Sequence, residues 1–157
     1  MKRVLVKSVF DTFDYVMDHY YPYGLDELAQ RKDDYAIISI QDSHTNGFGI
    51  QFVENHCCKG VLTLQFDDVV CPVDGAILFD EIMAKQIIDF IQEYKYVETL
   101  VIHCYAGQSR SRAVGAFVLK MFGKDNSNYF TKYSPNLYVY NKLIEVYKSL
   151  FQELVNP

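Results

Sequence analysis

A continuous apolar run constrains the fold of this chain more than any other feature. Residues 36–40 read Ala-Ile-Ile-Ser-Ile, without the regular polar and apolar alternation of a strand that faces water on one side. Such a strand is typical of a parallel sheet that is covered by helices on both faces. A second short run, at residues 99–102, has the same character. The two runs together predict an α/β fold around a mostly parallel sheet.

The remaining periodicity supplies the other elements that such a sheet needs. We expect strands at residues 4–10, 36–40, 61–66 and 99–102, and helices at residues 13–20, 79–94, 110–121 and 135–151. The first helix is predicted to follow the capping residue types Asp11-Thr12, and the last is predicted to have Ser134 as its cap and Pro135 in its first turn. This order predicts a central, mostly parallel sheet of four to five strands with helices on both faces.

Size and charge limit the classes of protein that fit. The chain has 157 residues, half of them hydrophobic, and no repeat or linker, which indicates a single domain over residues 1–157. A net charge of −5 and no basic run longer than Arg31-Lys32 argue against a nucleic-acid partner. No apolar stretch approaches the ~20 residues that span a bilayer, and the N-terminus is charged too early for a secretory signal. We therefore expect a cytoplasmic protein with no membrane partner.

The spacing of the cysteines is typical neither of a disulfide framework nor of a metal site. Cys57, Cys58, Cys71 and Cys104 are too few for a disulfide framework in a chain of this length, and they include no C-x-x-C pair. The first three are expected to be buried structural residues. The alternative is that one of them forms a reversible disulfide with Cys104.

Residues whose side chains can take part in a reaction follow the ends of two predicted strands. The segment 103–111, His-Cys-Tyr-Ala-Gly-Gln-Ser-Arg-Ser, follows the fourth strand and precedes a helix. Asp67 and Asp68 follow the third strand. Open α/β sheets place their sites at the carboxyl ends of their strands, so these residues are expected to share one edge of the sheet.

The spacing within this segment suits a nucleophile that attacks phosphate. Cysteine attacks as its thiolate, and backbone N–H groups of residues 105–110 at a helix N-terminus can stabilise that charge and the oxygens of a phosphoryl group. Arg110, six residues after Cys104, can offer a bidentate contact to two of those oxygens. Gly107 permits the tight curl of the loop, and Ser111 can point its hydroxyl at the sulfur.

With these residues the chain resembles the cysteine-dependent protein tyrosine and dual-specificity phosphatases, whose signature is H-C-x-x-G-x-x-R followed by Ser. The spelling of segment 103–111 is most similar to that of compact bacterial members of the dual-specificity type. A weaker resemblance extends over residues 36–122 and includes the strand that ends at Phe66-Asp67-Asp68.

The resemblance implies a two-step reaction that needs no metal or other cofactor. Cys104 forms a cysteinyl-phosphate, an upstream aspartic acid protonates the leaving oxygen, and water hydrolyses the intermediate. Asp68 is preferred as that acid and Asp67 as a residue that braces the loop, with the reverse assignment left open, while His103 orients the loop. The implied catalytic residues are Cys104, Arg110, Asp68 and Ser111, and the implied substrate-binding residues are Tyr105, Ala106, Gly107, Gln108, Ser109 and Arg110.

The substrate implied by the resemblance is a phosphorylated protein or peptide. Tyr105, Ala106, Gln108 and Ser109 are uncharged, which disfavours a highly anionic inositol headgroup. The first interpretation is therefore a phosphatase for phosphotyrosine, with phosphoserine and phosphothreonine left open. A phosphatase of phosphoinositides or other small phosphomonoesters is the alternative. A sulfurtransferase of rhodanese type and a non-catalytic phosphate-binding module remain as other classes.

An aromatic segment that could recognise phosphotyrosine is not evident from the sequence. The candidates are Tyr20, Tyr21 and Tyr23, or the loop that contains Phe48.

Overall fold

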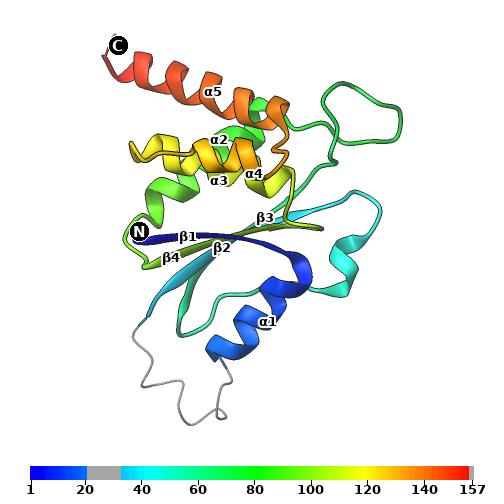
Figure 1. Ribbon diagram of the computed structural model, residues 1–157, viewed down its shortest axis with the longest axis vertical. Coiled ribbons are helices and arrows are strands. Elements are labelled where there is room, and N and C mark those ends of the chain that lie inside the picture. The colour runs from blue at the N-terminus through cyan, green and yellow to red at the C-terminus, as the bar shows by residue number, and fades with distance from the viewer. Residues whose placement is uncertain (21–32, 156–157) are drawn as a thin grey trace.

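The computed structural model describes residues 1–20 and 33–155 (Figure 1). Tyr21 and Tyr23 lie outside the described residues. The elements in chain order are β1 (Arg3–Ser8), α1 (Val9–Tyr20), β2 (Tyr35–Gln41), the short 3-10 helix η2 (Asn46–Gly49), β3 (Cys58–Gln65), α2 (Glu81–Glu93), β4 (Thr99–Cys104), α3 (Arg110–Met121), α4 (Ser127–Lys132) and α5 (Leu137–Val155).

The sheet is parallel, as the apolar runs predict. Its strand order is β1-β4-β2-β3, and each neighbouring pair is parallel. The two interior strands, β4 and β2, are the two apolar runs, and their register pairs Ile38 with Ile102 and Ser39 with His103. The interior position of these strands explains why they lack a polar face.

Helices cover both faces of the sheet, which confirms the predicted architecture. In Figure 1, α1 lies on one side of the strands, and α2, α3 and α5 lie on the other. Side chains alternate between the two sides along each strand. Ile37 and Val101 pack on the side of α1, whereas Ile38 and Ile102 join the larger core against α2, α3 and α5. All four side chains are buried.

The first helix begins earlier than the sequence predicts. β1 ends at Ser8, and Val9 already belongs to α1, so the prediction of a strand over residues 4–10 was too long. The Ser8 Oγ accepts a hydrogen bond from the Asp11 backbone N–H at 3.1 Å, and the Thr12 Oγ1 donates to the Ser8 carbonyl at 2.8 Å. Ser8 therefore caps the helix, and Asp11 and Thr12 lie inside it.

The last helix begins later than predicted. α5 starts at Leu137, and the Asn136 Oδ1 accepts a hydrogen bond from the Val139 backbone N–H at 3.1 Å. Asn136 is thus the cap, and the prediction of Ser134 as cap and Pro135 as the first helical residue was wrong. Asparagine caps as well as serine does, and the residue whose oxygen reaches the N–H three positions on takes the role.

The other helices show smaller differences between the predicted and the observed elements. α2 begins at Glu81 after the cap Asp80, whose side chain accepts from the Met83 N–H at 2.8 Å, so the expected start at residue 79 was slightly early. The short helix α4 was not predicted, because none of its residues is buried and it carries no apolar periodicity.

The cysteines outside the nucleophile segment differ in exposure. Cys57 and Cys58 are buried in the smaller core beside α1, as expected. Cys71 is exposed in the loop that follows Asp68, so the prediction of a buried structural residue was wrong at this position.

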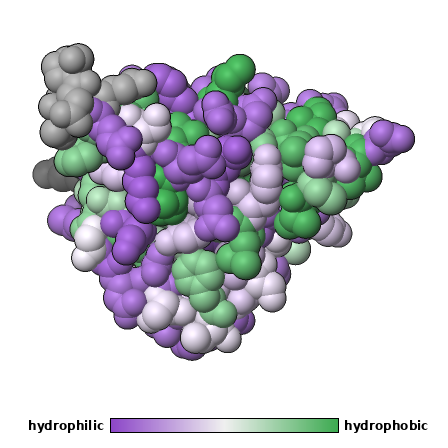
Figure 2. All heavy atoms as spheres, turned by 90° about the horizontal axis from the view of Figure 1, so that it is seen from above, coloured by the Kyte–Doolittle hydropathy of each residue, from purple (hydrophilic) through white to green (hydrophobic). Residues whose placement is uncertain are grey.

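Hydrophilic and hydrophobic side chains are intermingled on the surface seen in Figure 2, which views the molecule from above the orientation of Figure 1. Among the described residues, no helix combines the length and apolar character needed to cross a bilayer.

Candidate active site

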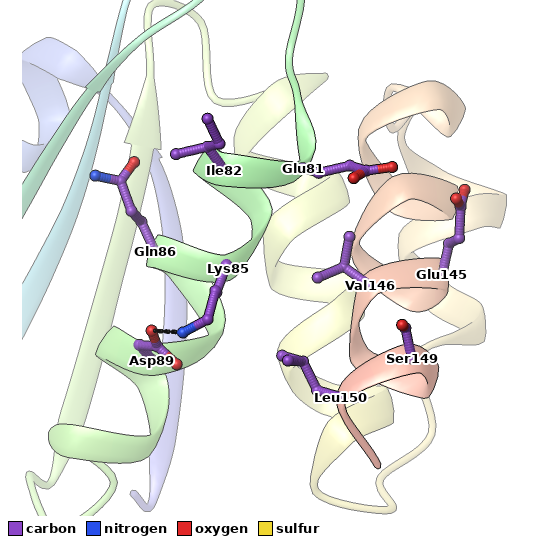
Figure 3. Close-up of a pocket in the computed structure, with 9 residues that line it drawn as sticks. All are labelled: Glu81, Ile82, Lys85, Gln86, Asp89, Glu145, Val146, Ser149 and Leu150. Carbon is purple, nitrogen blue, oxygen red and sulfur yellow. Dashed lines mark hydrogen bonds and ion pairs between the residues drawn. The ribbon is translucent and has the colours of Figure 1, made fainter. Parts of the chain in front are cut away.

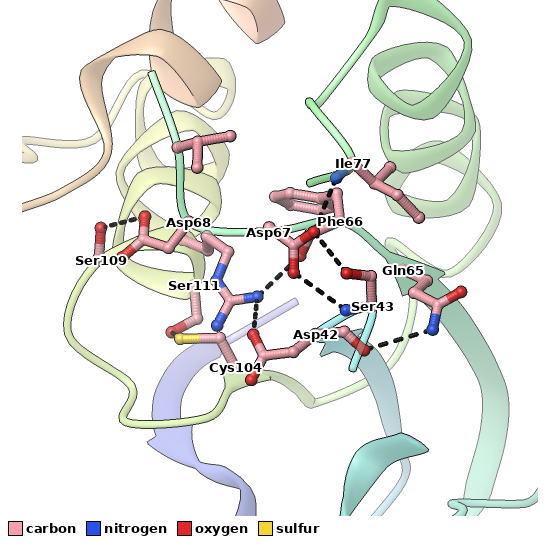
Figure 4. Close-up of polar contacts among 12 residues, drawn as sticks. Asp42, Ser43, Gln65, Phe66, Asp67, Asp68, Ile77, Cys104, Ser109 and Ser111 are labelled. Atoms are coloured by element: carbon pink, nitrogen blue, oxygen red, sulfur yellow. Dashed lines mark hydrogen bonds and ion pairs between the residues drawn. The ribbon is translucent and has the colours of Figure 1, made fainter. Parts of the chain in front are cut away.

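The predicted nucleophile lies where β4 gives way to α3. Cys104 is the last residue of the strand, and the helix begins at Arg110, so residues 105–109 form the connecting loop. The Cys104 Sγ is buried and lies 3.1 Å from the Ser111 Oγ. Figure 4 shows these two side chains next to each other at the base of the loop. A hydroxyl at this distance can donate a hydrogen bond to a thiolate.

The loop packs closely against the end of β1. Gly107 has φ +71°, and a Cβ at this position would lie 2.6 Å from the Lys7 carbonyl carbon and 2.7 Å from the Ser8 nitrogen. The Arg112 Nε donates to the Gly107 carbonyl at 2.8 Å, and its guanidinium lies 3.6 Å from the centre of the Tyr133 ring. Only glycine combines this backbone angle with this close approach.

We expect Gly107→Ala to destabilise the fold and to reduce function, whereas Gly123→Ala provides a matched control. Gly123 has φ +69°, and its Cβ would meet no atom within 4 Å. The control should lose about 1–2 kcal/mol of unfolding free energy from backbone strain alone. The Gly107 variant should lose roughly 1–3 kcal/mol more from the steric clash. Equal losses in urea denaturation would show that the contact with β1 is unimportant.

Arg110 is held at one end of its guanidinium and unpaired at the other. Its Nη1 forms an ion pair with the Asp42 Oδ1 at 2.6 Å and donates to the Phe66 carbonyl at 2.7 Å. Its Nε is buried and has no hydrogen-bond partner among the described residues. A buried, fixed guanidinium with an unused N–H is suited to an anion that offers oxygen acceptors.

Asp42 is a site residue that the sequence reasoning missed. It comes directly after β2, so the argument from strand ends that selected Asp67 and Asp68 could have selected Asp42 as well. Its carboxylate balances the buried charge of Arg110 and fixes the guanidinium in place.

The two neighbouring aspartates make contacts with different parts of the molecule. The Asp67 carboxylate accepts hydrogen bonds from the Ser43 hydroxyl at 2.6 Å, the Ser43 N–H at 3.0 Å and the Ile77 N–H at 2.7 Å (Figure 4). Partial burial would raise the pKa of Asp67, but these hydrogen bonds outweigh it and lower the pKa below its ordinary value. Asp67 therefore fastens its loop to the segment after β2 as an ionised carboxylate.

Asp68 faces the nucleophile loop instead. Its Oδ1 accepts hydrogen bonds from the Ser109 Oγ at 2.8 Å and from the Asn136 Nδ2 at 2.8 Å. Its side chain is exposed, so it lies at the rim of the loop. Asn136, the cap of α5, thus belongs to the surroundings of Asp68 as well.

His103 supports the strand from within the sheet. A carbonyl can only accept, so the contact of 3.2 Å between Nδ1 and the Cys104 carbonyl places the proton on Nδ1. The Ser39 Oγ, at 2.6 Å, then donates to Nε2. Burial, helped by the charge of Arg110, lowers the pKa of His103 to about 4. The ring is therefore neutral near pH 7.

This low pKa predicts how the stability depends on pH. An unfolded histidine takes up a proton below its ordinary pKa of 6.5, whereas the folded protein resists protonation until about pH 4. The contribution of His103 to the free energy of unfolding is complete above pH 6.5. It falls by about 3 kcal/mol between pH 6.5 and 4. Denaturant titrations of the wild type and His103→Gln should show a weaker pH dependence in the variant. Parallel curves would contradict the assignment.

Aromatic side chains form one rim of the nucleophile loop. Tyr105 is 49% exposed, and its ring stacks on that of Phe48, with centroids 5.0 Å apart and an interplanar angle of 24°. The ring centroid of Phe10 lies 5.7 Å from that of Phe48, and the Phe10 side chain is also half exposed. Phe48 has a φ of +56°, which a non-glycine residue rarely adopts. We call Phe10, Phe48 and Tyr105 the aromatic rim.

The other predicted loop residues occupy different depths. Ala106 and Gln108 are exposed, Ser109 is half-buried and Gly107 is buried. The segment 103–111 thus has a buried base and an exposed rim, as a loop that binds the end of a larger substrate requires.

Two large hollows among the described residues lie away from this loop. One of about 400 Å³ lies between α2 and α5 and includes Ile82, Val146, Leu150 and the Lys85–Asp89 ion pair (Figure 3). The hollow that reaches His103, Tyr105 and Phe48 holds only about 10 Å³. The chemistry of the loop, rather than the size of a cavity, marks the candidate site.

Comparison with known proteins gives a match of fold only. No protein-family model and no curated protein sequence matches the chain. The solved structure of PTPMT1 superimposes with a TM-score of 0.53 at 17% identity, covering 99% of this chain and 96% of that one. PTPMT1 in complex with PI(5)P gives a TM-score of 0.53 at 15% identity, covering 89% and 88%. The human tyrosine phosphatase-like serine/threonine/tyrosine-interacting protein gives 0.49 at 21% identity, covering 82% and 84%.

The resemblance in the nucleophile segment and the similarity over nearly the whole length therefore agree. The parallel sheet, the helices on both of its faces and the match to PTPMT1 show the fold. This chain has the α/β fold of the dual-specificity and protein-tyrosine-phosphatase-like proteins.

Proposed function

We propose that the chain is a phosphatase that hydrolyses phosphorylated protein through a cysteinyl-phosphate. One observation carries the proposal. One short loop brings three groups together. Cys104 and Arg110 flank it, and Asp68 accepts a hydrogen bond from its Ser109. The Nε of Arg110 is buried and has no hydrogen-bond partner among the described residues. A nucleophile, a proton donor and a cation in one place are the groups that the reaction requires.

In the first step the Cys104 thiolate attacks phosphorus, so that an S–P bond forms as the P–O bond to the leaving group breaks. Asp68 gives its proton to the leaving oxygen. Arg110 and the N–H groups of the loop hold the peripheral oxygens, whose charge is largest in the transition state.

In the second step water attacks phosphorus, and the Asp68 carboxylate takes a proton from it. The S–P bond breaks with its electron pair on sulfur, and inorganic phosphate leaves. The Ser111 hydroxyl, 3.1 Å from Sγ, stabilises the departing thiolate by donating a hydrogen bond.

The contacts of the two aspartates support Asp68 as the acid. Three hydrogen bonds keep the Asp67 carboxylate ionised, and an ionised group has no proton to give. The two described hydrogen bonds of Asp68 both go to Oδ1, which leaves Oδ2 to carry the proton.

The aromatic rim supports phosphotyrosine as the substrate. A phosphotyrosine ring bound with its phosphate in the loop can pack against Tyr105 and Phe48, which are exposed beside it. A smaller phosphoserine has no ring to make this contact. Segment 105–111 contains one charged side chain, that of Arg110. A single positive charge favours a single phosphate over a polyanionic headgroup. The complex of PTPMT1 with PI(5)P makes phosphoinositides the second candidate.

A substrate panel combined with two neighbouring carboxylate variants tests the proposal. The panel contains phosphotyrosyl, phosphoseryl and phosphothreonyl peptides, PI(5)P and thiosulfate, with the wild type, Asp68→Asn and Asp67→Asn. We expect the phosphotyrosyl peptide to be hydrolysed fastest. Asp68→Asn should lower kcat on that peptide by about 10²–10⁴-fold. Asp67→Asn should chiefly lower the melting temperature.

Each other outcome has a defined meaning. A larger loss of kcat in Asp67→Asn than in Asp68→Asn, in variants shown to be folded, would reverse the assignment of the acid. Preferred hydrolysis of PI(5)P would establish the second candidate. Turnover of thiosulfate alone, or of nothing, would reject the phosphatase.

A further inference from the structure

Asn136 joins the three parts of the chain that meet at the candidate site. Its Nδ2 donates to the Asp68 Oδ1 at 2.8 Å and to the Val69 carbonyl at 3.2 Å, both in the loop after β3. Its backbone N–H donates to the Ser109 carbonyl at 3.1 Å, in the nucleophile loop. Its Oδ1 caps α5 through the Val139 N–H.

The orientation of this amide follows from its partners. Two acceptors, a carboxylate and a carbonyl, surround one end of the side chain, and an N–H donor lies at the other. Only the arrangement with Nδ2 toward Asp68 and Oδ1 toward Val139 satisfies all three contacts. Asn136 is 4% exposed, so a flipped amide would leave buried groups unpaired.

Asp68, Ser109 and Asn136 also form a closed triangle. The Ser109 Oγ donates to the same Oδ1 of Asp68 that Asn136 contacts, while the Ser109 carbonyl accepts from Asn136. Asp68 itself is exposed, and the two described hydrogen bonds of its carboxylate come from Ser109 and Asn136. The distance from its carboxylate to the nucleophile loop therefore depends on Ser109 and Asn136.

We propose that Asn136 is a positioning residue for the general acid: it holds Asp68 over the nucleophile loop with Oδ2 turned to the leaving oxygen. This inference rests on the proposed phosphatase function. Its specific consequence concerns the leaving group. A poor leaving group depends on a well-placed acid, whereas a good one departs without much help.

The test uses a series of aryl phosphates whose leaving phenols differ in pKa, with Asn136→Ser. Serine keeps the helix cap but is too short to reach Asp68. We measure kcat/KM, which reports the first step, in which the phenol leaves. We expect it to fall on the order of 10- to 100-fold with the poorest leaving group, as for a misplaced catalytic group, and by less than about twofold with the best. Asp68→Asn should show the same trend more strongly, and the double variant should be no slower than Asp68→Asn alone.

Asn126→Ser is the matched control. The Asn126 Nδ2 also ties elements together, through the Ala116 carbonyl at 3.0 Å and the Tyr140 Oη at 3.2 Å, but it contacts neither loop of the site. Its kcat/KM should match that of the wild type for every leaving group. An equal loss for all leaving groups in Asn136→Ser, or additive losses in the double variant, would overturn the inference. A wild type without turnover of the best substrate would instead reject the proposed function.

Discussion

Replacing Cys104 by serine is expected to lower the turnover of an aryl phosphate by on the order of 10⁵–10⁶-fold, which places it below detection. A serine hydroxyl attacks only when a base removes its proton. The nearest histidine in sequence, His103, is not such a base, since its Nδ1 donates to the Cys104 carbonyl and its Nε2 accepts from Ser39. The measurement is the rate of phenol release, combined with a search for a phosphorylated protein by mass spectrometry.

Cys71→Ser is the appropriate control for this loss. Cys71 is an exposed cysteine outside the nucleophile loop, so its replacement should leave the rate and the melting temperature nearly unchanged. The Cys104 variant should remain folded, because serine is slightly smaller and keeps a polar partner for Ser111. Residual turnover above about 1% of the wild-type rate in Cys104→Ser would show that another group is the nucleophile.

The parallel core could be predicted because burial on both faces leaves a local mark in the sequence. β2 and β4 are interior strands, and both contain a mostly apolar run without polar and apolar alternation. The nucleophile segment could be predicted for a similar reason, since its spacing and its place between a strand and a helix are local features. The strand order, by contrast, depends on contacts between distant segments.

The different environments of Asp67 and Asp68 could not be derived from their neighbours in the chain. Asp67 is fixed by Ser43, which lies 24 positions earlier, and Asp68 by Ser109 and Asn136, which lie 41 and 68 positions later. The preference for Asp68 came from a resemblance, and the contacts supply a physical reason for it.

The wrong helix starts have a different cause. Several good capping types stand side by side at both places, and only the folded backbone decides which oxygen reaches an N–H three positions on. Ser8 and Asn136 do so, whereas Asp11 and Ser134 were the predicted choices. The loop of Phe48 was one of the aromatic candidates, but its contacts with Tyr105 and Phe10 join segments that are distant in the sequence and could not be derived from it.

Arg110→Lys is expected to have the second largest effect on turnover. Lysine keeps the positive charge but lacks the planar fork that can contact two phosphate oxygens while Nη1 stays bound to Asp42 and the Phe66 carbonyl. Two lost charge-assisted hydrogen bonds are worth about 3–6 kcal/mol, which corresponds to a loss in kcat/KM of about 10²–10⁴-fold. Competitive inhibition by inorganic phosphate should weaken as well, because the same N–H groups are expected to hold it.

Two further variants separate the shape of this side chain from its charge. Arg3→Lys makes the same exchange on the exposed start of β1, and it should leave kcat/KM unchanged. Asp42→Asn keeps the guanidinium and removes only its counter-charge, so the loss should be smaller than in Arg110→Lys. If Arg110→Lys retains kcat/KM within tenfold of the wild type while it binds phosphate normally, then charge alone suffices. In that case the unpaired Nε of Arg110 is not a substrate contact, and the geometry proposed for the transition state is wrong.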